Sequence, residues 1–547
     1  MKQQDYGPWN PGVESALPRR LLPLATLYRP QNVFGSLADA LELADLTGLA
    51  AAELVAFRPQ RLALHELLVR VMAELSVPDG PRVEDLGINF RAMASIILER
   101  YVEPRMKHIE QTYHRLEREV AALAGAELEA AFAARALADW EGRAAGERNA
   151  TVRAALRAVA RVAGSVCARH GRLWGEPALL SKVAVRLACN EHGSVEIGRL
   201  IEPLIAEAVR SERYALLPAQ REPVVMNIKG ASASGKSTMR PLQKRLAGEI
   251  GVAWGDFALI SPDIWRKQLL DYGALGEAYR YAGSFTGQEL RMIDHKLDRY
   301  MAAKAGRGGI PHLLIDRFRF DSFAPESDEA GSNLLTRFGR IVYLFFMITP
   351  PEATVERSWK RGLEVGRYKA VDDLLAHNVE AYSGMPELFF TWALRGDKRV
   401  HFLDNSVPAG ERPKSAAFGA DGELNVLDVG RMLDVARFAR INVDATSPQQ
   451  VYRDRAAMAA GNSTGFLATC ARRLPALNFV ARDSGRVYLR IEAGRPAWIE
   501  PAALAAALED AETRAGILAL APQAREAPPR RAGEAPLIER SHTLGAC

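Results

Sequence analysis

A loop rich in glycine and serine, near the middle of the chain, has residue types and spacing that suit phosphate binding. Gly230, Gly235, Lys236 and Ser237 match the pattern G-x-x-x-x-G-K-[ST]. The two glycines would let backbone N–H groups converge on an anion. Lys236 would reach the β- and γ-phosphates, and the hydroxyl of Ser237 would hold Mg²⁺. The predicted nucleotide-binding residues are Gly230, Ala231, Ser232, Ala233, Ser234, Gly235, Lys236, Ser237 and Thr238.

The flanking sequence favours this interpretation over an accidental glycine-rich turn. An apolar run at 224–228 precedes the loop and predicts a strand, and a helix is expected to follow it. A phosphate on such a loop is also stabilised by the positive N-terminal end of the helix.

An acid that follows the next predicted strand could serve the acceptor side of a phosphate-transfer site. Asp263 comes directly after the run 257–261. A carboxylate that faces the γ-phosphate can accept the proton of an attacking hydroxyl and orient its oxygen. Asp263 could equally be the N-cap of the next helix. We favour the catalytic base and expect Arg266, one turn further on, to face the substrate.

A second acid closes the third predicted strand. Asp316 ends the apolar run 312–316, in the manner of a Walker B strand, and could bind Mg²⁺ directly or through water. The alternative is a turn residue at a strand end. Arg319, three residues later, could point to substrate or phosphate.

Arginines then gather after the fourth predicted strand. Arg357, Arg361 and Arg367 lie close together, and Gly362 and Gly366 flank the bend that a lid would need. Phosphoryl transfer spreads negative charge over the equatorial oxygens, which arginines can stabilise. Exposed arginines on a helix surface are the plainer alternative for each of them. We predict a catalytic role for Lys236, Asp263 and these three arginines.

These residues need a sheet that brings several strand ends to one edge. Strands that alternate with helices predict an α/β fold with a doubly wound, mostly parallel five-stranded sheet, and such sheets bind ligands beyond the carboxyl ends of their strands. The predicted strands are 224–228, 257–261, 312–316, 341–348 and 400–404.

The rest of the chain predicts helices before the sheet and a small α+β region after it. Leu64, Leu67, Leu68 and Val71 form an amphipathic helical stripe, and the region around it contains no catalytic motif. Short strand candidates lie near 478–480, 486–491 and 497–499. We predict an irregular segment at 1–35, a helical domain at 36–216, a kinase domain at 220–415, a small α+β module at 416–521 and a disordered tail at 522–547.

Composition excludes a few classes of protein. The chain has 547 residues with a formal net charge of +5, too weak a basic bias to argue for nucleic acid. Its four cysteines are scattered, without a C-x-x-C pair, which suits a reducing compartment. The longest purely apolar run, 341–348, is far too short to span a membrane. We therefore expect a cytoplasmic protein without a membrane partner, and export as an effector is the alternative.

Taken together, the residues between about 220 and 410 resemble the zeta-toxin family of P-loop kinases. The family has small or hydroxylated residues where Arg317 and Phe318 stand here, a departure that bears on the substrate. By this resemblance, Gly230–Thr238 is the phosphate loop, and Asp263 is the base with Arg266 beside it. Asp316 and Arg319 correspond to the acid and the arginine after the third strand. The two phosphate-facing arginines correspond to Arg357 and Arg367, and Arg361 is the alternative for either place.

The resemblance implies an enzyme that uses ATP and Mg²⁺ to phosphorylate a hydroxyl of a small nucleotide-linked metabolite, such as a nucleotide sugar or NAD. It also implies a toxin or effector, with an antitoxin or other protein partner for the helical region. Two alternatives stay open. One is a polynucleotide 5′-kinase, which would need a basic groove, whereas the charge in this sequence is scattered. The other is a regulatory or scaffold protein that uses the phosphate loop as a switch.

Overall fold

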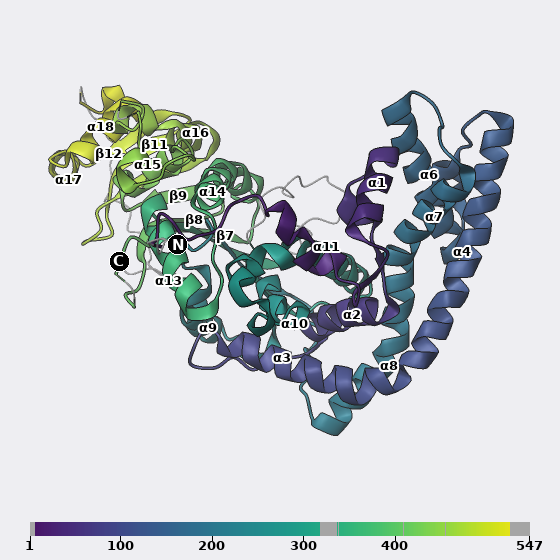
Figure 1. Ribbon diagram of the computed structural model, residues 1–547. Coiled ribbons are helices and arrows are strands. Elements are labelled where there is room, and N and C mark those ends of the chain that lie inside the picture. Colours follow the sequence, from purple (N-terminus) through teal and green to yellow (C-terminus); the bar gives the residue numbers. More distant parts are fainter. Residues whose placement is uncertain (1–5, 318–335, 337, 409, 455, 526–547) are drawn as a thin grey trace.

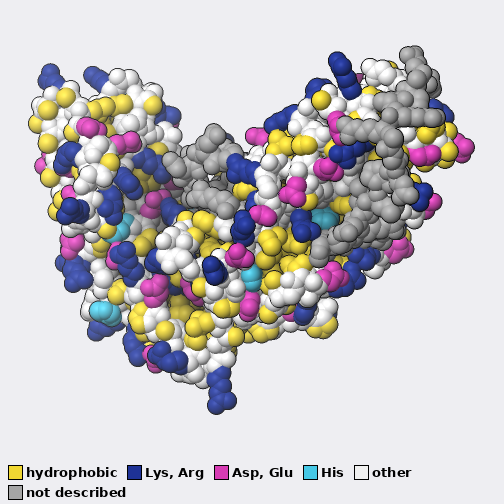
Figure 2. Space-filling view, turned by 180° about the vertical axis from the view of Figure 1, so that it is seen from behind, with side chains coloured by type: hydrophobic (Ala, Val, Ile, Leu, Met, Phe, Trp, Pro, Cys, Tyr) yellow, Lys and Arg dark blue, Asp and Glu magenta, His cyan; other side chains and the backbone are white. Residues whose placement is uncertain are grey.

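The computed structural model describes residues 6–317, 336, 338–408, 410–454 and 456–525. A long helical arm lies at one end of the molecule, the sheet and its helices occupy the middle, and the C-terminal helices lie at the other end (Figure 1). Seen from behind, the two ends rise on either side of a hollow (Figure 2). Arg319 lies outside the described residues, so its predicted contact with substrate stays a prediction.

The predicted helical region is helical almost throughout. Pro59 opens α2, where its missing N–H costs no hydrogen bond, and a left-handed Gly48 ends α1. The apolar faces of α4, α6 and α7 enclose a core of their own. The helices are α1 (Leu37–Thr47), α2 (Pro59–Glu74), α3 (Asp85–Ile97), α4 (Met106–Ala134), α5 (Trp140–Gly146), α6 (Ala150–His170), α7 (Pro177–Ala188) and α8 (Ser194–Glu212). A small antiparallel pair, β1 (Val33–Phe34) and β2 (Ala56–Phe57), precedes α2.

Helix α2 joins the arm to the rest of the molecule. It packs between α8 and α11 (Ala282–Gly306), and it is buried on nearly every side rather than along one stripe. Its polar face therefore meets other polar groups: Glu289 of α11 accepts two hydrogen bonds from Arg61, at 2.6 and 2.8 Å, and contacts His65 Nε2 at 2.7 Å. Since all three side chains are buried, the arm is fixed to α11 by an ion pair that water does not reach.

The sheet has ten strands, not the five that the sequence predicts. All five predicted strands are present, and they lie side by side in the order β4-β5-β3-β6-β7 with parallel pairing. β7 then pairs antiparallel with β8, and the sheet continues to β12. The strands are β3 (Val224–Lys229), β4 (Phe257–Ile260), β5 (His312–Asp316), β6 (Ile341–Ile348), β7 (Lys398–Asp404), β8 (Lys414–Ala420), β9 (Glu423–Val426), β10 (Ala476–Val480), β11 (Val487–Glu492) and β12 (Arg495–Ile499).

Helices cover both faces of the parallel part of the sheet. The apolar side chains of β3 alternate between two cores: Val225 belongs to the larger one with α11, and Met226 and Ile228 belong to the one that contains α9. The helices that connect these strands are α9 (Arg240–Glu249), α10 (Arg266–Leu269), α11, α13 (Pro351–Val365) and α14 (Val371–Trp392).

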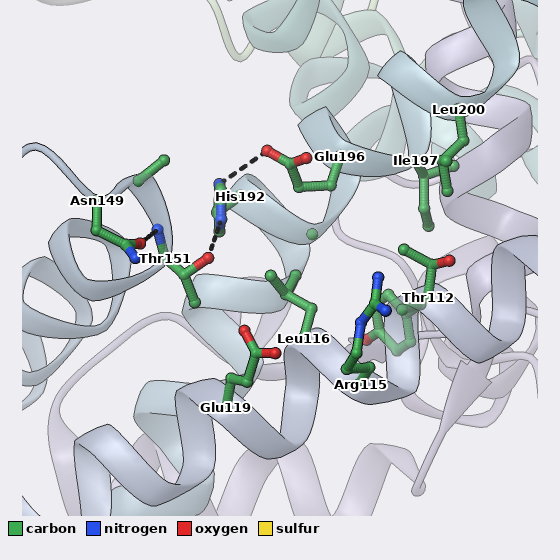
Figure 3. Close-up of a pocket in the computed structure, with 13 residues that line it drawn as sticks. Thr112, Arg115, Leu116, Glu119, Asn149, Thr151, His192, Glu196, Ile197 and Leu200 are labelled. Atoms are coloured by element: carbon green, nitrogen blue, oxygen red, sulfur yellow. Dashed lines mark hydrogen bonds and ion pairs between the residues drawn. The ribbon is translucent and has the colours of Figure 1, made fainter.

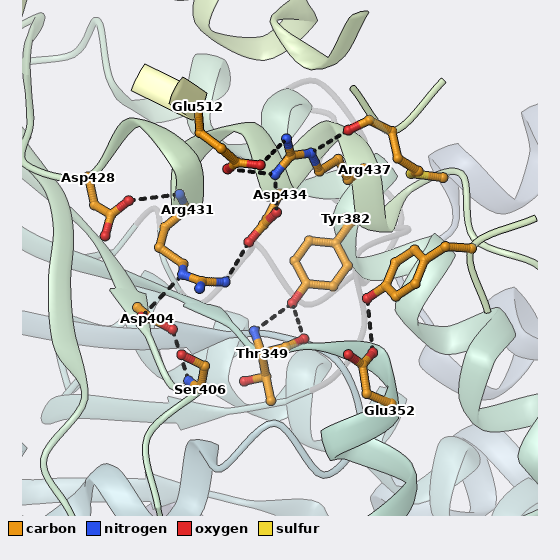
Figure 4. Close-up of polar contacts among 12 residues, drawn as sticks. Thr349, Glu352, Tyr382, Asp404, Ser406, Asp428, Arg431, Asp434, Arg437 and Glu512 are labelled. Carbon is orange, nitrogen blue, oxygen red and sulfur yellow. Dashed lines mark hydrogen bonds and ion pairs between the residues drawn. The ribbon is translucent and has the colours of Figure 1, made fainter. Parts of the chain in front are cut away.

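The C-terminal region continues the sheet and adds α15 (Val429–Phe438), α16 (Gly465–Arg473), α17 (Pro501–Ala507) and α18 (Ala511–Leu520). Arg431 of α15 bridges Asp404, at the end of β7, and Asp434, while Arg437 binds Glu512 of α18 at 2.9 Å (Figure 4). Burial raises the pKa of Asp434 to about 6 against the opposing effect of its arginines. The predicted strands near 478–499 are confirmed, but β8 and β9 were not predicted. No helix in the described part of the chain is both long and apolar enough to cross a bilayer.

The ion pair between α2 and α11 predicts a strong effect on stability. Glu289→Ala leaves Arg61 buried without its carboxylate, and breaking a buried pair in this way costs about 3–5 kcal/mol. We expect the thermal unfolding midpoint to fall by several degrees. Glu191→Ala is the matched control, since it removes a solvent-exposed partner of Arg299 and exposed pairs contribute about 0–1 kcal/mol. Equal midpoints for the two variants would contradict the assigned role of Glu289.

Candidate functional site

The phosphate loop has the strained and crowded backbone that a tight anion nest requires. Ala233 and Gly235 have positive φ values of 60° and 94°. A Cβ at Gly230 would lie 2.7 Å from Ser234 Oγ and 2.8 Å from the Met347 Cβ, so a side chain there would force the loop apart. Two predicted glycines are therefore required by geometry: one by its φ value and one by lack of space.

The closed end of the loop is held by the neighbouring strands. The carbonyl oxygen of Ser234 accepts hydrogen bonds from Thr349 Oγ1 at 3.0 Å and from Asn405 Nδ2 at 2.7 Å. Arg357 adds a longer contact to the same oxygen, at 3.4 Å, and donates to the Asn405 carbonyl at 2.8 Å. Arg357 was predicted to face the phosphate. Its guanidinium instead binds backbone carbonyls and ties the loop to the end of β7.

Lys236 and Ser237 stand where the loop meets the helical turn that leads into α9. Lys236 Nζ folds back onto the carbonyl oxygens of Gly230 and Ala231, at 3.0 and 2.9 Å. Ser237 Oγ donates to Asp316 Oδ2 at 2.7 Å. The structure thus joins two residues that are 79 positions apart, and a hydroxyl beside a carboxylate is a donor set that suits Mg²⁺. No group of three or more histidine, cysteine or acidic side chains that could bind a metal occurs within the described ranges.

Asp263 lies across from the loop, at the end of β4, and is not a helix N-cap. The N-cap position belongs to Ser261, and no side chain caps that turn. The Asp263 carboxylate instead contacts Arg266 Nε at 2.9 Å and Arg367 Nη2. Burial acts to raise the pKa of Asp263, but Arg367 and Arg266 outweigh it and hold that pKa well below its usual range. The side chain keeps 44% of its surface exposed, so an acceptor molecule could reach it.

Two further arginines differ in how they are held. Arg266 donates to the Gly283 carbonyl at 2.7 Å and to Thr286 Oγ1 at 2.8 Å, so α11 fixes its orientation. Arg361 lies close to Arg367, and its Nε has no hydrogen-bond partner in the described structure. Burial, together with the charge of Arg367, lowers the pKa of Arg361 to about 9. A bound anion would accept a hydrogen bond from this nitrogen and offset the repulsion between the two arginines.

The residue after Asp316 explains one departure from the family pattern. Arg317 is buried and binds Asp294 at 2.6 Å and Asp298 at 2.5 Å, both on α11. It therefore belongs to the core rather than to the substrate. Lys229, the last residue of β3, is also buried, and burial with the nearby Arg317 and Lys236 lowers its pKa to about 7. Lys229 was not among the predicted site residues, although its position directly before the glycine-rich loop was a usable signal.

A separate cavity of about 370 Å³ lies in the helical arm, between α4, α6 and α8 (Figure 3). His192 lines it and contacts Thr151 Oγ1 at 3.2 Å and Glu196 at 3.8 Å. Arg115 and Glu119 of α4 lie on the opposite wall. No catalytic motif occurs in the sequence of this region, and acidic and basic side chains both line the cavity, so its charge selects no ligand class.

Comparison of the chain with protein-family models matched no family, and comparison with curated proteins found no relative. The chemistry of the site therefore has to be argued from its own residues.

Lys236 provides the most direct test of phosphate binding. Lys236→Ala should weaken the binding of Mg²⁺-ATP by roughly tenfold or more, because one charge-assisted hydrogen bond contributes about 1.5–3 kcal/mol. Isothermal titration calorimetry measures the dissociation constant. Lys244→Ala is the control, since this lysine lies on the exposed face of α9 and contacts only Asp79 among the described residues, at 3.4 Å. Unchanged ATP affinity in the Lys236 variant would refute the assignment of the loop.

Proposed function

We propose that the chain is an ATP-dependent kinase that transfers the γ-phosphate to a hydroxyl of a small nucleotide-linked metabolite. One observation carries the proposal: the Ser237–Asp316 pair and Lys236 share an edge of the sheet with Asp263 and its arginines. β4, β5 and β3 are adjacent and parallel, so their carboxyl ends open on the same side. Donor and acceptor groups can then meet between them.

The donor half follows from the loop. Backbone N–H groups of Gly230–Thr238 would bind the phosphates, and Ser237 with Asp316 would hold Mg²⁺, which neutralises developing charge on the phosphate oxygens. Lys236 would exchange its contacts with the loop carbonyls for a phosphate oxygen. Arg361, whose Nε has no hydrogen-bond partner in the described structure, would bind the transferring group. Arg357 supports the loop and is a positioning residue.

The acceptor half centres on Asp263. Its lowered pKa keeps the carboxylate ionised, so it would accept a hydrogen bond from the substrate hydroxyl and orient the oxygen for in-line attack. Phosphoryl transfer through a loose transition state needs little removal of the hydroxyl proton before attack, so a weakly basic carboxylate is sufficient. Arg367 pairs with Asp263 in the present structure, and a negatively charged phosphate would compete for that guanidinium.

A regulatory role of the helical arm is the second candidate. The observation in its favour is that α11 both receives Arg61 of the arm and orients Arg266 through Gly283 and Thr286. A partner protein bound to the arm, such as an antitoxin, could therefore alter the acceptor side without touching it. The resemblance to toxin kinases supports an action in the cytoplasm or, after export, in a host cell.

Asp263→Asn tests the kinase proposal. The amide cannot accept the hydroxyl proton, so we expect phosphate transfer to fall at least ~100-fold, the scale of general base catalysis. ATP affinity should remain within a few-fold of wild type. Transfer is measured by mass spectrometry of a metabolite extract after incubation with ATP, as a gain of one phosphate. Wild-type transfer by the variant would disprove the role of Asp263.

A further inference from the structure

The loop between α13 and α14 carries a third basic residue close to Arg361 and Arg367. Lys369 has a side chain only 14% exposed, in contact with Asp373 at 3.4 Å and with His377. The positive charges of Arg361 and Arg367 disfavour the charged form of Lys369, and the carboxylate of Asp373 favours it. Three cations thus share one partly buried region with two carboxylates, Asp373 and the Asp263 that binds Arg367. One positive charge is left over, and a bound anion would balance it.

The groups around Lys369 come from three elements. Asp373 and His377 belong to α14, Arg361 to α13, and Arg367 to the same loop. The positive charges of Lys236 in the phosphate loop and of Arg291 in α11 also act on His377. Burial, partly offset by Asp373, lowers the pKa of Lys369 to about 8. A bound anion would therefore stabilise the charged ammonium group of Lys369.

The residue between the two cations faces the other way. Tyr368 packs against Gly362, where a Cβ would lie 2.4 Å from its ring, and its hydroxyl group bonds to that of Tyr279 at 2.9 Å. The guanidinium of Arg280 lies 4.6 Å from the Tyr368 ring and 4.3 Å from the ring of Tyr6. Arg280 also donates to the Pro11 carbonyl at 2.8 Å.

The N-terminal segment thereby packs behind the loop between α13 and α14, which we call the lid. Tyr6 and Pro11 contact Arg280, and Trp9 packs against the apolar cluster that includes Val355 of α13 and Leu374 of α14. Tyr368 is fixed on this side. Of its two neighbours in the chain, Arg367 contacts Asp263, and Lys369 contacts Asp373 and His377.

We infer that Lys369 is a further phosphate-binding residue of this site, acting on the terminal phosphate of the donor, and that Tyr368 positions it together with Arg367. The inference rests on the proposed kinase function. It adds a residue that the predicted arginine cluster omits, and it gives the N-terminal segment a role in holding the lid.

Binding of two nucleotides to the full-length chain tests this inference. AMP-PNP carries the terminal phosphate and ADP lacks it, so Lys369→Met should weaken Mg²⁺-AMP-PNP binding by roughly tenfold, the scale of one charge-assisted hydrogen bond, and leave ADP binding unchanged. Lys369→Arg keeps the charge and should retain at least part of the selectivity. Lys360→Met removes an exposed lysine of α13 and should leave both affinities unchanged.

The positioning role of Tyr368 is tested by the ratio of AMP-PNP to ADP affinity, which a general loss of stability would not change. Tyr368→Ala should lower AMP-PNP affinity relative to ADP affinity, as Lys369→Met does, and Tyr368→Phe should restore it because the ring remains against Arg280. Thermal midpoints of all variants show whether they are folded.

The possible failures are distinguishable. A wild-type chain that binds neither nucleotide would refute the kinase proposal together with this inference. A wild-type chain that binds both, with an unchanged ratio of affinities in Lys369→Met, would refute only the role of Lys369. An unchanged ratio in Tyr368→Ala would refute the positioning role of Tyr368.

Discussion

The buried contact between Glu289 and Arg61 is the interaction on which the arrangement of the molecule depends. A carboxylate without water needs its charge compensated. Here the bidentate Arg61 does so, and His65 adds a hydrogen bond. Lys296 extends the network to Ser194 at 2.6 Å, and burial with the Lys296 charge lowers the pKa of His65 to about 4, so the ring is neutral near pH 7. Because α2, α8 and α11 all contribute, the arm and the sheet form one packed unit.

This constraint reaches the candidate site through α11. The same helix that receives the arm also holds Arg266, and it neutralises Arg317 with Asp294 and Asp298. Farther along the sheet, Arg431 of α15 binds Asp404 at the end of β7, next to the residue whose amide holds the loop Gly230–Thr238 (Figure 4). The two flanking regions therefore support the two ends of the candidate site.

Local sequence was a good guide wherever local physics decides the outcome. The loop Gly230–Thr238 was predictable because its glycines, lysine and serine act over nine adjacent positions. The five parallel strands were predictable because each is a short buried apolar run. Beyond β7, the strands β10–β12 were predicted, but β8 and β9 were not. That β9 joins β10 in the same sheet depends on a partner distant in the chain. The stripe on α2 was correct, but its opposite, polar face is buried too.

The sequence by itself determined a loop with the phosphate-binding pattern after β3, an acid at the end of β5, and basic residues after β6. Only the tertiary structure decided what each charged side chain does. It paired Asp263 with Arg367, 104 residues away, turned Arg357 toward backbone carbonyls, and buried Arg317. The physical reason is that a backbone turn is set by its own residues, whereas a charge takes its role from whichever partner folding brings within reach.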